Sequence, residues 1–238
     1  MAGRDWQSVA LAFHAASIGE GRWSDALEGF RRVLGSSGAV LELHDLKAGV
    51  VPLFEHAGMP DEAWPRYVAH YHRVNPRVAV LRTMGVGVTS HDRTFFSERA
   101  MDRAEFYADF LAPWGFRYYF GAPLANDPGR LALITVQRSP AEGTPGSQDE
   151  EVYDRLFPHV RQALEVHARL RASELRAAVA EHAIDRVALG MVWLDARGRV
   201  LLANRAALRL AAGGALAISG ARLRVEDPSS RAALDRAI

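Results

Sequence analysis

Three aromatic side chains share one face of a predicted helix over residues 60–74, where they could bind a small molecule. Trp64, Tyr67 and Tyr71 are spaced i, i+3 and i+7, which places them one above another along a helix. Asn75 follows at the helix end and adds an amide that can donate and accept hydrogen bonds. Such a stripe is most often ordinary core packing. Its functional alternative is one wall of an apolar ligand pocket.

A predicted strand over residues 116–124 supplies the opposite wall of this pocket. This strand carries the aromatic residues Phe116, Tyr118 and Phe120. The sequence therefore predicts a small, mostly apolar ligand between the helix and the sheet. The candidate ligand-binding residues are Trp64, Tyr67, Tyr71, Asn75, Trp114, Phe116, Tyr118 and Phe120.

Other kinds of site find little support in the sequence. The chain has no cysteine, which excludes disulfides, thiolate metal centres and cysteine nucleophiles. His70 and His72 point in different directions on a helix, and His44 and His56 could meet across a hairpin but lack an evident third ligand. No phosphate-binding glycine loop, nucleophile elbow or carboxylate pair is evident. We expect no catalytic residue, no metal and no cofactor, and hence no enzyme.

The composition indicates a globular protein with one large domain or two ordinary ones, and we expect two. The 238 residues are 49% hydrophobic and 24% charged, which is enough for a substantial core. No apolar run is long enough to cross a bilayer, and the N-terminal residues lack the pattern of an export signal. A net charge of +1 gives no strong basic surface for nucleic acid. We therefore expect a cytoplasmic protein without a membrane partner.

Hydrophobic periodicity and turn residues divide the first part of the chain into helices and two hairpins. Helices are predicted over residues 6–17, 23–34, 60–74 and 102–111, and strands over 39–44, 50–56, 116–124 and 131–138. Ser24 is expected to cap the second helix and Gly35 to end it. The predicted fold class is α/β of the α+β type, in which helices flank an antiparallel sheet.

A long helix is predicted to connect the two domains. Ser147 to Glu150 resemble a capping box, and the helical pattern continues to His182, with Pro158 kinking the helix or beginning its main part. Beyond Leu170 the pattern becomes charged, so we expect the helix to leave the first domain and to pair with a second copy in a homodimer. The predicted divisions are a sensor domain over 1–146, the connector over 147–186 and a second domain over 187–238.

The second domain opens on a recognisable motif. Residues 190–204, GMVWLDARGRVLLAN, indicate a strand, a glycine turn, a second strand and a helix capped by Asn204. This motif resembles the opening of a PAS domain. The stretch 220–225 and the following Asp227-Pro228 are similar to degenerate PAS-like segments that precede the DNA-binding end of LuxR-type bacterial regulators. The resemblance implies a PAS-like domain that is incomplete in this chain.

The first 180 residues resemble the GAF-like sensor half of the same regulators. The resemblance lies in the order and spacing of FYADFLAPWGF (106–116), GAPL (121–124) and LFPHVRQAL (156–164). It implies the sensory region of a LuxR-type helix-turn-helix transcriptional regulator, which would bind DNA only through a C-terminal domain absent from this chain. The aromatic stripe is also similar to the Trp-Tyr-Asp signature of acyl-homoserine-lactone receptors. Because Asn75 provides no carboxylate to accept the ligand amide proton, that ligand class is not expected.

Three functions are compatible with these observations. The first is a sensor in which a bound ligand reorients the connector and the PAS-like domain of a dimer. The second is a ligand-free dimerisation scaffold whose pocket is filled by its own aromatic side chains. The third, a small-molecule enzyme with a GAF-like fold, is disfavoured by the lack of a convergent nucleophile, acid pair or metal cluster.

Overall fold

The computed structural model describes residues 5–214, 216–219, 222–225 and 227–237. The chain divides into two compact units, Met1–Ala168 and Arg169–Ile238. Helix α7 (Ser147–Asp185) contributes residues to both units and continues through Pro158 without a break. The domain limits predicted at residues 147 and 187 stay predictions. Among the described helices, none combines the length and the apolar character needed to cross a membrane.

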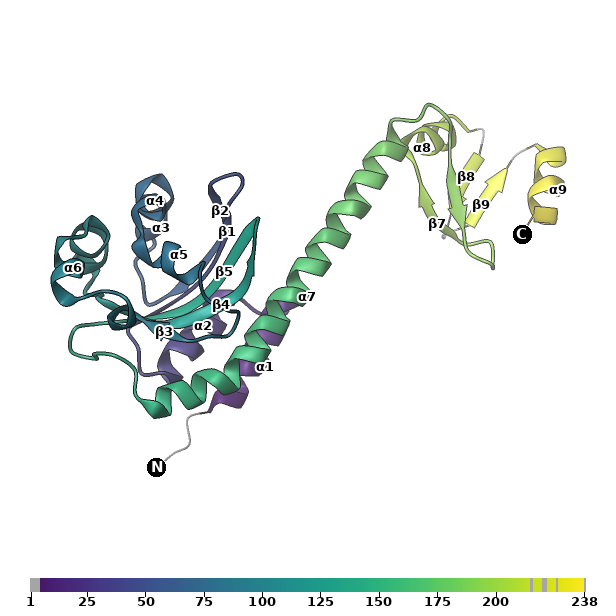
Figure 1. The fold of residues 1–238 in the computed structure, drawn as a ribbon. Coiled ribbons are helices and arrows are strands. Elements are labelled where there is room, and N and C mark those ends of the chain that lie inside the picture. The colour runs from purple at the N-terminus through teal and green to yellow at the C-terminus, as the bar shows by residue number, and fades with distance from the viewer. Residues whose placement is uncertain (1–4, 215, 220–221, 226, 238) are drawn as a thin grey trace. The chain divides into compact units, whose positions relative to one another are not determined.

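A five-stranded antiparallel sheet lies at the centre of the first unit (Figure 1). Its strand order is β2-β1-β5-β4-β3. The strands are β1 (Gly38–Asp45), β2 (Val50–Ala57), β3 (Ser90–His91), β4 (Tyr118–Asp127) and β5 (Arg130–Arg138). The two predicted hairpins, β1–β2 and β4–β5, are confirmed, and so is the antiparallel sheet flanked by helices.

Helices cover both faces of this sheet. On one face lie α1 (Trp6–Ser17), α2 (Trp23–Val33) and the first half of α7, with Phe13, Leu27, Leu41 and Val160 buried in their common core. The other face carries the short helices α3 (Ala63–Arg66), η1 (Tyr67–Tyr71), α4 (His72–Val74), α5 (Pro76–Leu81), η2 (Asp92–Thr94), α6 (Glu98–Arg103), η3 (Phe106–Leu111) and η4 (Ala112–Trp114). The helix predicted over residues 102–111 is therefore two helices, α6 and η3.

The chain changes direction between α4 and α5, where the structure extends the sequence-based expectation. The helix predicted over residues 60–74 contains the π-helical segment η1 and stops before Asn75. Pro76 does more than end that helix, because it begins α5 at the first helical position, where proline is well tolerated. Asn75 caps α5, since its Oδ1 accepts a hydrogen bond from the Arg77 amide at 3.0 Å. This short, unpredicted helix carries Arg77 to the sheet.

Two predicted helix caps are corrected by the structure. Ser24 lies inside the first turn of α2, and Arg22 occupies the N-cap position. Ser147 is the first helical residue of α7, so the cap position falls on Gly146. The Gly146 amide donates to Asp149 Oδ2 at 3.1 Å. Asp149 therefore takes the role that the sequence gives to Glu150. Its carboxylate accepts a hydrogen bond from the amide of the residue that precedes the helix.

The second unit begins as its motif predicts. Strands β6 (Val192–Leu194) and β7 (Val200–Ala203) pair antiparallel and lead into α8 (Arg205–Ala212). Asn204 caps α8: its Oδ1 accepts from the Ala207 amide and from the Met191 amide, each at 2.9 Å. A second hairpin and a helix follow, namely β8 (Leu216–Ser219), β9 (Arg222–Val225) and α9 (Pro228–Ala237). Gly220 and Ala221, which open the PAS-like stretch 220–225, lie outside the described residues.

Candidate functional site

An inner cavity lies between the sheet and the short helices of its second face. Its volume is about 30 Å³, room for roughly one or two water molecules. The apolar lining includes Val40, Phe54, Met59, Phe106, Phe110 and Leu111, and the polar lining includes Glu42, Tyr67, Asn75, Arg77, Tyr119 and Gln137. Aromatic walls with a few convergent polar groups are the usual composition of small-molecule sites.

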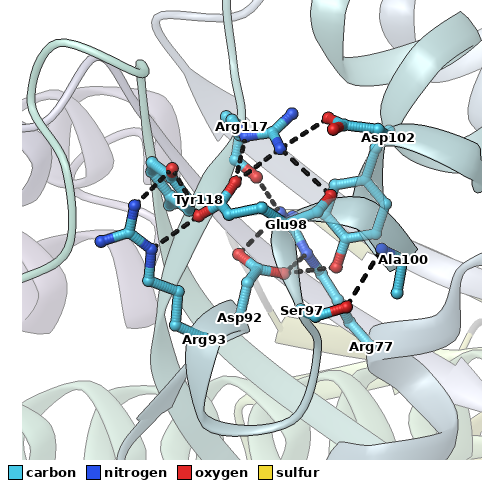
Figure 2. A network of polar contacts seen from close by, with 10 residues as sticks. Arg77, Asp92, Arg93, Ser97, Glu98, Ala100, Asp102, Arg117 and Tyr118 are labelled. Carbon is cyan, nitrogen blue, oxygen red and sulfur yellow. Dashed lines mark hydrogen bonds and ion pairs between the residues drawn. The ribbon is translucent and has the colours of Figure 1, made fainter.

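Arg77 and Asp92 form a buried ion pair beside this cavity (Figure 2). Arg77 Nε donates to Asp92 Oδ1 at 2.8 Å, and Arg77 Nη2 donates to Asp92 Oδ2 at 3.0 Å. Arg77 Nη1 donates to Gln137 Oε1 and Nη2 to the carbonyl of Arg117, both at 2.9 Å. Charge-assisted bonds in this forked geometry are among the strongest in proteins. They tie α5 and η2 to strand β5 and to the residue that precedes strand β4.

Three aromatic rings surround the Arg77 guanidinium. Its carbon lies 5.3 Å from the ring centre of Phe106, 5.1 Å from that of Tyr107 and 5.0 Å from that of Tyr119. The Tyr107 hydroxyl and the Tyr119 amide both donate to Asp92. Burial opposes the charge on Arg77, but the Asp92 carboxylate outweighs it and raises the pKa of Arg77 above its usual range. Arg77 is therefore charged, and Asp92 neutralises that charge.

Glu42 and His44 form a second buried pair, a carboxyl group beside an imidazole, on strand β1. His44 Nε2 lies 3.1 Å from Glu42 Oε2, and both side chains are more than nine-tenths buried. Among the described residues, this nitrogen forms no hydrogen bond of regular geometry, so the contact is electrostatic in character and strengthens when His44 is protonated. Burial opposes the charged form of His44, but the Glu42 carboxylate outweighs it and raises the pKa of His44 above its ordinary value.

We expect the contribution of the Glu42–His44 pair to the free energy of unfolding to fall as pH rises. A histidine whose pKa is raised by folding stabilises the folded state fully below its unfolded pKa of about 6.5, and this contribution is lost as pH rises through the folded-state pKa. The difference in free energy of unfolding between the wild type and His44→Gln, measured by urea denaturation from pH 5.5 to 9, is expected to shrink with rising pH. A difference that stays constant over this range would contradict the assignment.

Of the residues predicted from the sequence, Tyr67 and Asn75 line the inner cavity. Asn75 Nδ2 donates to the Tyr67 hydroxyl at 3.0 Å, while its Oδ1 caps α5. Burial raises the pKa of Tyr67 well above its ordinary value, and the nearby Glu42 carboxylate adds to that effect. Asn75 therefore fixes both a helix start and the orientation of a phenol at the cavity wall.

Trp64 lines a second, larger space, which we call the outer groove. The groove has a volume of about 580 Å³ and is lined by Gly21, Arg22, Trp23, Ser24, Phe54, Glu55, His56, Asp61 and Trp64. Phe54 lines both the outer groove and the inner cavity. Its ring stacks on that of Trp64, with 4.6 Å between ring centres and 19° between ring planes. Phe54 and Trp64 therefore form the partition between the two spaces.

Tyr71 and Trp114 lie outside the lining of the inner cavity. The Tyr71 ring stacks on Phe110 with 4.8 Å between ring centres. The guanidinium of Arg66 lies over both residues, 5.6 Å from the Tyr71 ring centre and 5.7 Å from that of Trp114. These two side chains support the cavity wall from behind rather than forming it.

The aromatic residues of the 116–120 stretch do not share one cavity face, which corrects the prediction for this strand. Phe120 points to the face covered by α1, α2 and α7, where its ring centre lies 4.8 Å from that of Tyr153. Tyr119 lines the cavity instead, because neighbouring residues of a strand point to opposite faces. Phe116 packs among the aromatic side chains next to the cavity without lining it.

Tyr118 belongs to a polar network at the protein surface (Figure 2). Its hydroxyl donates to Glu98 Oε1 at 2.9 Å and accepts from Arg93 Nη2 at 3.0 Å. Arg117 Nη2 binds both Glu98, at 2.6 Å, and Asp102, at 2.7 Å. Partial burial opposes the Glu98 charge, but the hydrogen bonds from Arg117, Arg93 and Tyr118 outweigh it and lower the pKa of Glu98 to about 2. This network joins α6 to β4 and does not line the cavity.

The histidines do not come together as a metal site in the part of the chain that the structure describes. There, no group of three or more His, Asp or Glu side chains could hold a metal ion. His56 pairs with Val40 in the β1–β2 ladder, so His44 and His56 do not meet across the hairpin as the sequence allowed. His70 Nε2 instead contacts Glu105 Oε1 at 2.6 Å.

Comparison with solved structures finds several that are similar to this chain. The LBD domain of VqsR from Pseudomonas aeruginosa is similar with a TM-score of 0.51 at 15% identity, covering 69% of this chain and 96% of that domain. CepR2, an N-acylhomoserine-lactone-dependent LuxR-family transcription factor from Burkholderia cenocepacia, gives 0.48 at 14% identity, covering 71% and 98%. SdiA of Escherichia coli, in complex with octanoyl-rac-glycerol, gives 0.48 at 15%, covering 70% and 66%.

No protein-family model matches the sequence, and no curated protein sequence matches it. At 15% identity, the likeness to the VqsR domain concerns the fold alone. The resemblance of the sequence to the sensory region of a LuxR-type regulator is therefore confirmed for the fold.

Proposed function

We propose that this chain is the ligand-sensing region of a LuxR-type transcriptional regulator and that it is not an enzyme. The observation that carries the proposal is the inner cavity, where Arg77 and Glu42 stand among aromatic rings and are backed by their buried partners Asp92 and His44. Buried charges are costly and need partners. Their concentration at the cavity wall, in a unit with the fold of a known LBD domain, supports recognition of a small molecule there.

Signal transmission is the second part of the proposal. A ligand that prefers one of two arrangements of the connector, residues 147–186, would shift the population toward that arrangement. The chain would act as a homodimer through this helix in the cytoplasm. It would reach DNA only through a helix-turn-helix domain outside this chain.

A ligand-free dimerisation scaffold is the second candidate function, and the size of the cavity favours it. A space of about 30 Å³ is well below the 300 Å³ or more of usual ligand sites. A sensor therefore has to open the partition formed by Phe54 and Trp64 to admit a ligand, whereas a scaffold keeps it closed.

Trp64→Ala tests the sensor against the scaffold. A library of small apolar metabolites is screened for compounds that raise the melting temperature, and Trp64→Ala is expected to abolish each shift, because the ligand then loses the indole ring that lines the outer groove. Trp6→Ala is the matched control, since Trp6 packs near His159, away from the cavity. Shifts that are equal in wild type and Trp64→Ala would contradict ligand binding at this site. Finding no stabilising compound would favour the scaffold.

A further inference from the structure

Glu42 presents a buried carboxylate to the inner cavity. Its side chain is 8% exposed and lies on the same strand face as Val40, which also lines the cavity. His44 contacts one oxygen of the carboxylate, and the Tyr67 hydroxyl also interacts with the carboxylate. An ionised carboxylate has about four positions at which it can accept hydrogen bonds. Glu42 therefore keeps capacity to accept a hydrogen bond from a ligand in the cavity.

Arg77 cannot provide the matching positive charge for Glu42. Its guanidinium is directed to both oxygens of Asp92, to Gln137 and to the carbonyl of Arg117. Its charge is thereby neutralised by Asp92. Within the described lining of the cavity, Glu42 is the charged side chain without a bidentate arginine partner, and its contacts are the His44 imidazole and the Tyr67 hydroxyl.

The rings around the cavity favour a cation over a neutral group. Phe54, Tyr67, Phe106 and Phe110 line it together with Glu42, and aromatic faces attract ammonium groups when both are shielded from water. A neutral apolar ligand would cover the carboxylate without satisfying it, which disfavours binding. We propose that the inner cavity selects ligands that carry a protonated amine, with Glu42 as the specificity-determining residue. This inference rests on the ligand-sensing function proposed above.

The two spaces on either side of Phe54 indicate how such a ligand fits. The inner cavity, at about 30 Å³, matches an ammonium headgroup, and the outer groove, at about 580 Å³, has room for an apolar body. Rotation of Phe54 away from Trp64 joins the two spaces. The ligand class is accordingly a primary amine on an elongated apolar chain, with its head at Glu42 and its chain in the outer groove.

Matched amines and alcohols test the inference on the full chain. The probes are the straight-chain alkylamines from butylamine to octylamine and the alcohols of equal length, with affinity measured by calorimetry at pH 7, where the amines are protonated. The tightest amine is expected to bind wild type at least tenfold more tightly than its alcohol. In Glu42→Gln the two should bind within threefold of each other, and Glu42→Asp, which keeps the charge, should retain a preference for the amine.

Glu151→Gln is the control for net charge, because Glu151 pairs with Arg155 on the surface of α7 and should leave the amine preference unchanged. Amine preference that survives in Glu42→Gln would overturn the role of Glu42. Alcohols that bind wild type as tightly as amines would overturn the ligand class while leaving the sensing function intact. If neither series binds, the ligand class is also overturned, and a different molecule found on the purified chain would keep the sensing function.

Discussion

Replacing Asp92 with alanine is expected to lower the free energy of unfolding of the first unit by about 3–5 kcal/mol. The carboxylate is fully buried and accepts from Arg77, from the Tyr107 hydroxyl and from the Tyr119 amide. Without it, the buried guanidinium of Arg77 has no counter-charge, and this uncompensated charge is the source of the large effect. Urea denaturation followed by tryptophan fluorescence measures the change.

Asp102→Ala is the matched control for this experiment. Asp102 also pairs with an arginine, Arg117, but its side chain is 62% exposed. Exposed pairs contribute about 0–1 kcal/mol, so the control is expected to lose less than about 1 kcal/mol. If Asp92→Ala were no more destabilising than Asp102→Ala, the Arg77–Asp92 pair would not be the element that holds α5 against the sheet.

Charging the exposed apolar face of α7 is expected to convert a homodimer into a monomer. Every described residue from 168 to 183 is exposed, and Leu175 and Val179 are 66% and 61% exposed. With Ala168, Ala172 and His182 they form a repeat with alternating spacings of four and three, which is the pattern of a coiled-coil seam. A helix exposed on all sides gains stability by burying such a seam against a second copy.

The double variant Leu175→Glu, Val179→Glu is therefore expected to weaken dimerisation at least 100-fold. Burying each of these side chains contributes roughly 1.5–3 kcal/mol, and four would be buried per dimer. Sedimentation equilibrium measures the dissociation constant. The control is Ser173→Glu with Ala177→Glu, which adds the same charge on the opposite face of the same turns. A dimer that survives the first variant would show that α7 does not pair in this way.

The elements of the fold could be predicted because their signals are local. The alternation of side chains along each strand and the glycine at each turn can be recognised in a short stretch of sequence. Asn204 likewise lies where the sequence predicts a helix cap. The helix α5 is not predicted from the sequence, because Pro76 also fits the end of the preceding helix. Proline is equally compatible with the first position of a new helix, and the two interpretations differ only in whether Asn75 caps the next segment.

The candidate site is harder to predict because its polar groups pair with residues that are far away in the sequence. Arg77 binds Gln137, 60 residues further along the chain, and nothing in the local sequence of either residue indicates burial. Tyr67 and Asn75 can be found through helical spacing. Phe120 is predicted at the site but packs on the opposite face of the sheet, and Tyr119 lines the cavity. Which of two neighbouring strand residues faces the cavity depends on how β4 pairs with β5, and the local sequence does not show this.

Native mass spectrometry of the purified chain tests the central claim most directly, because it reports bound small molecules and subunit number in one spectrum. A dimer that carries one small molecule per subunit is the result predicted for a ligand-sensing region, and the mass of that molecule should fit an amine. A dimer without any bound molecule, unchanged after incubation with the alkylamine and alcohol probes, would contradict the sensing function and favour the scaffold.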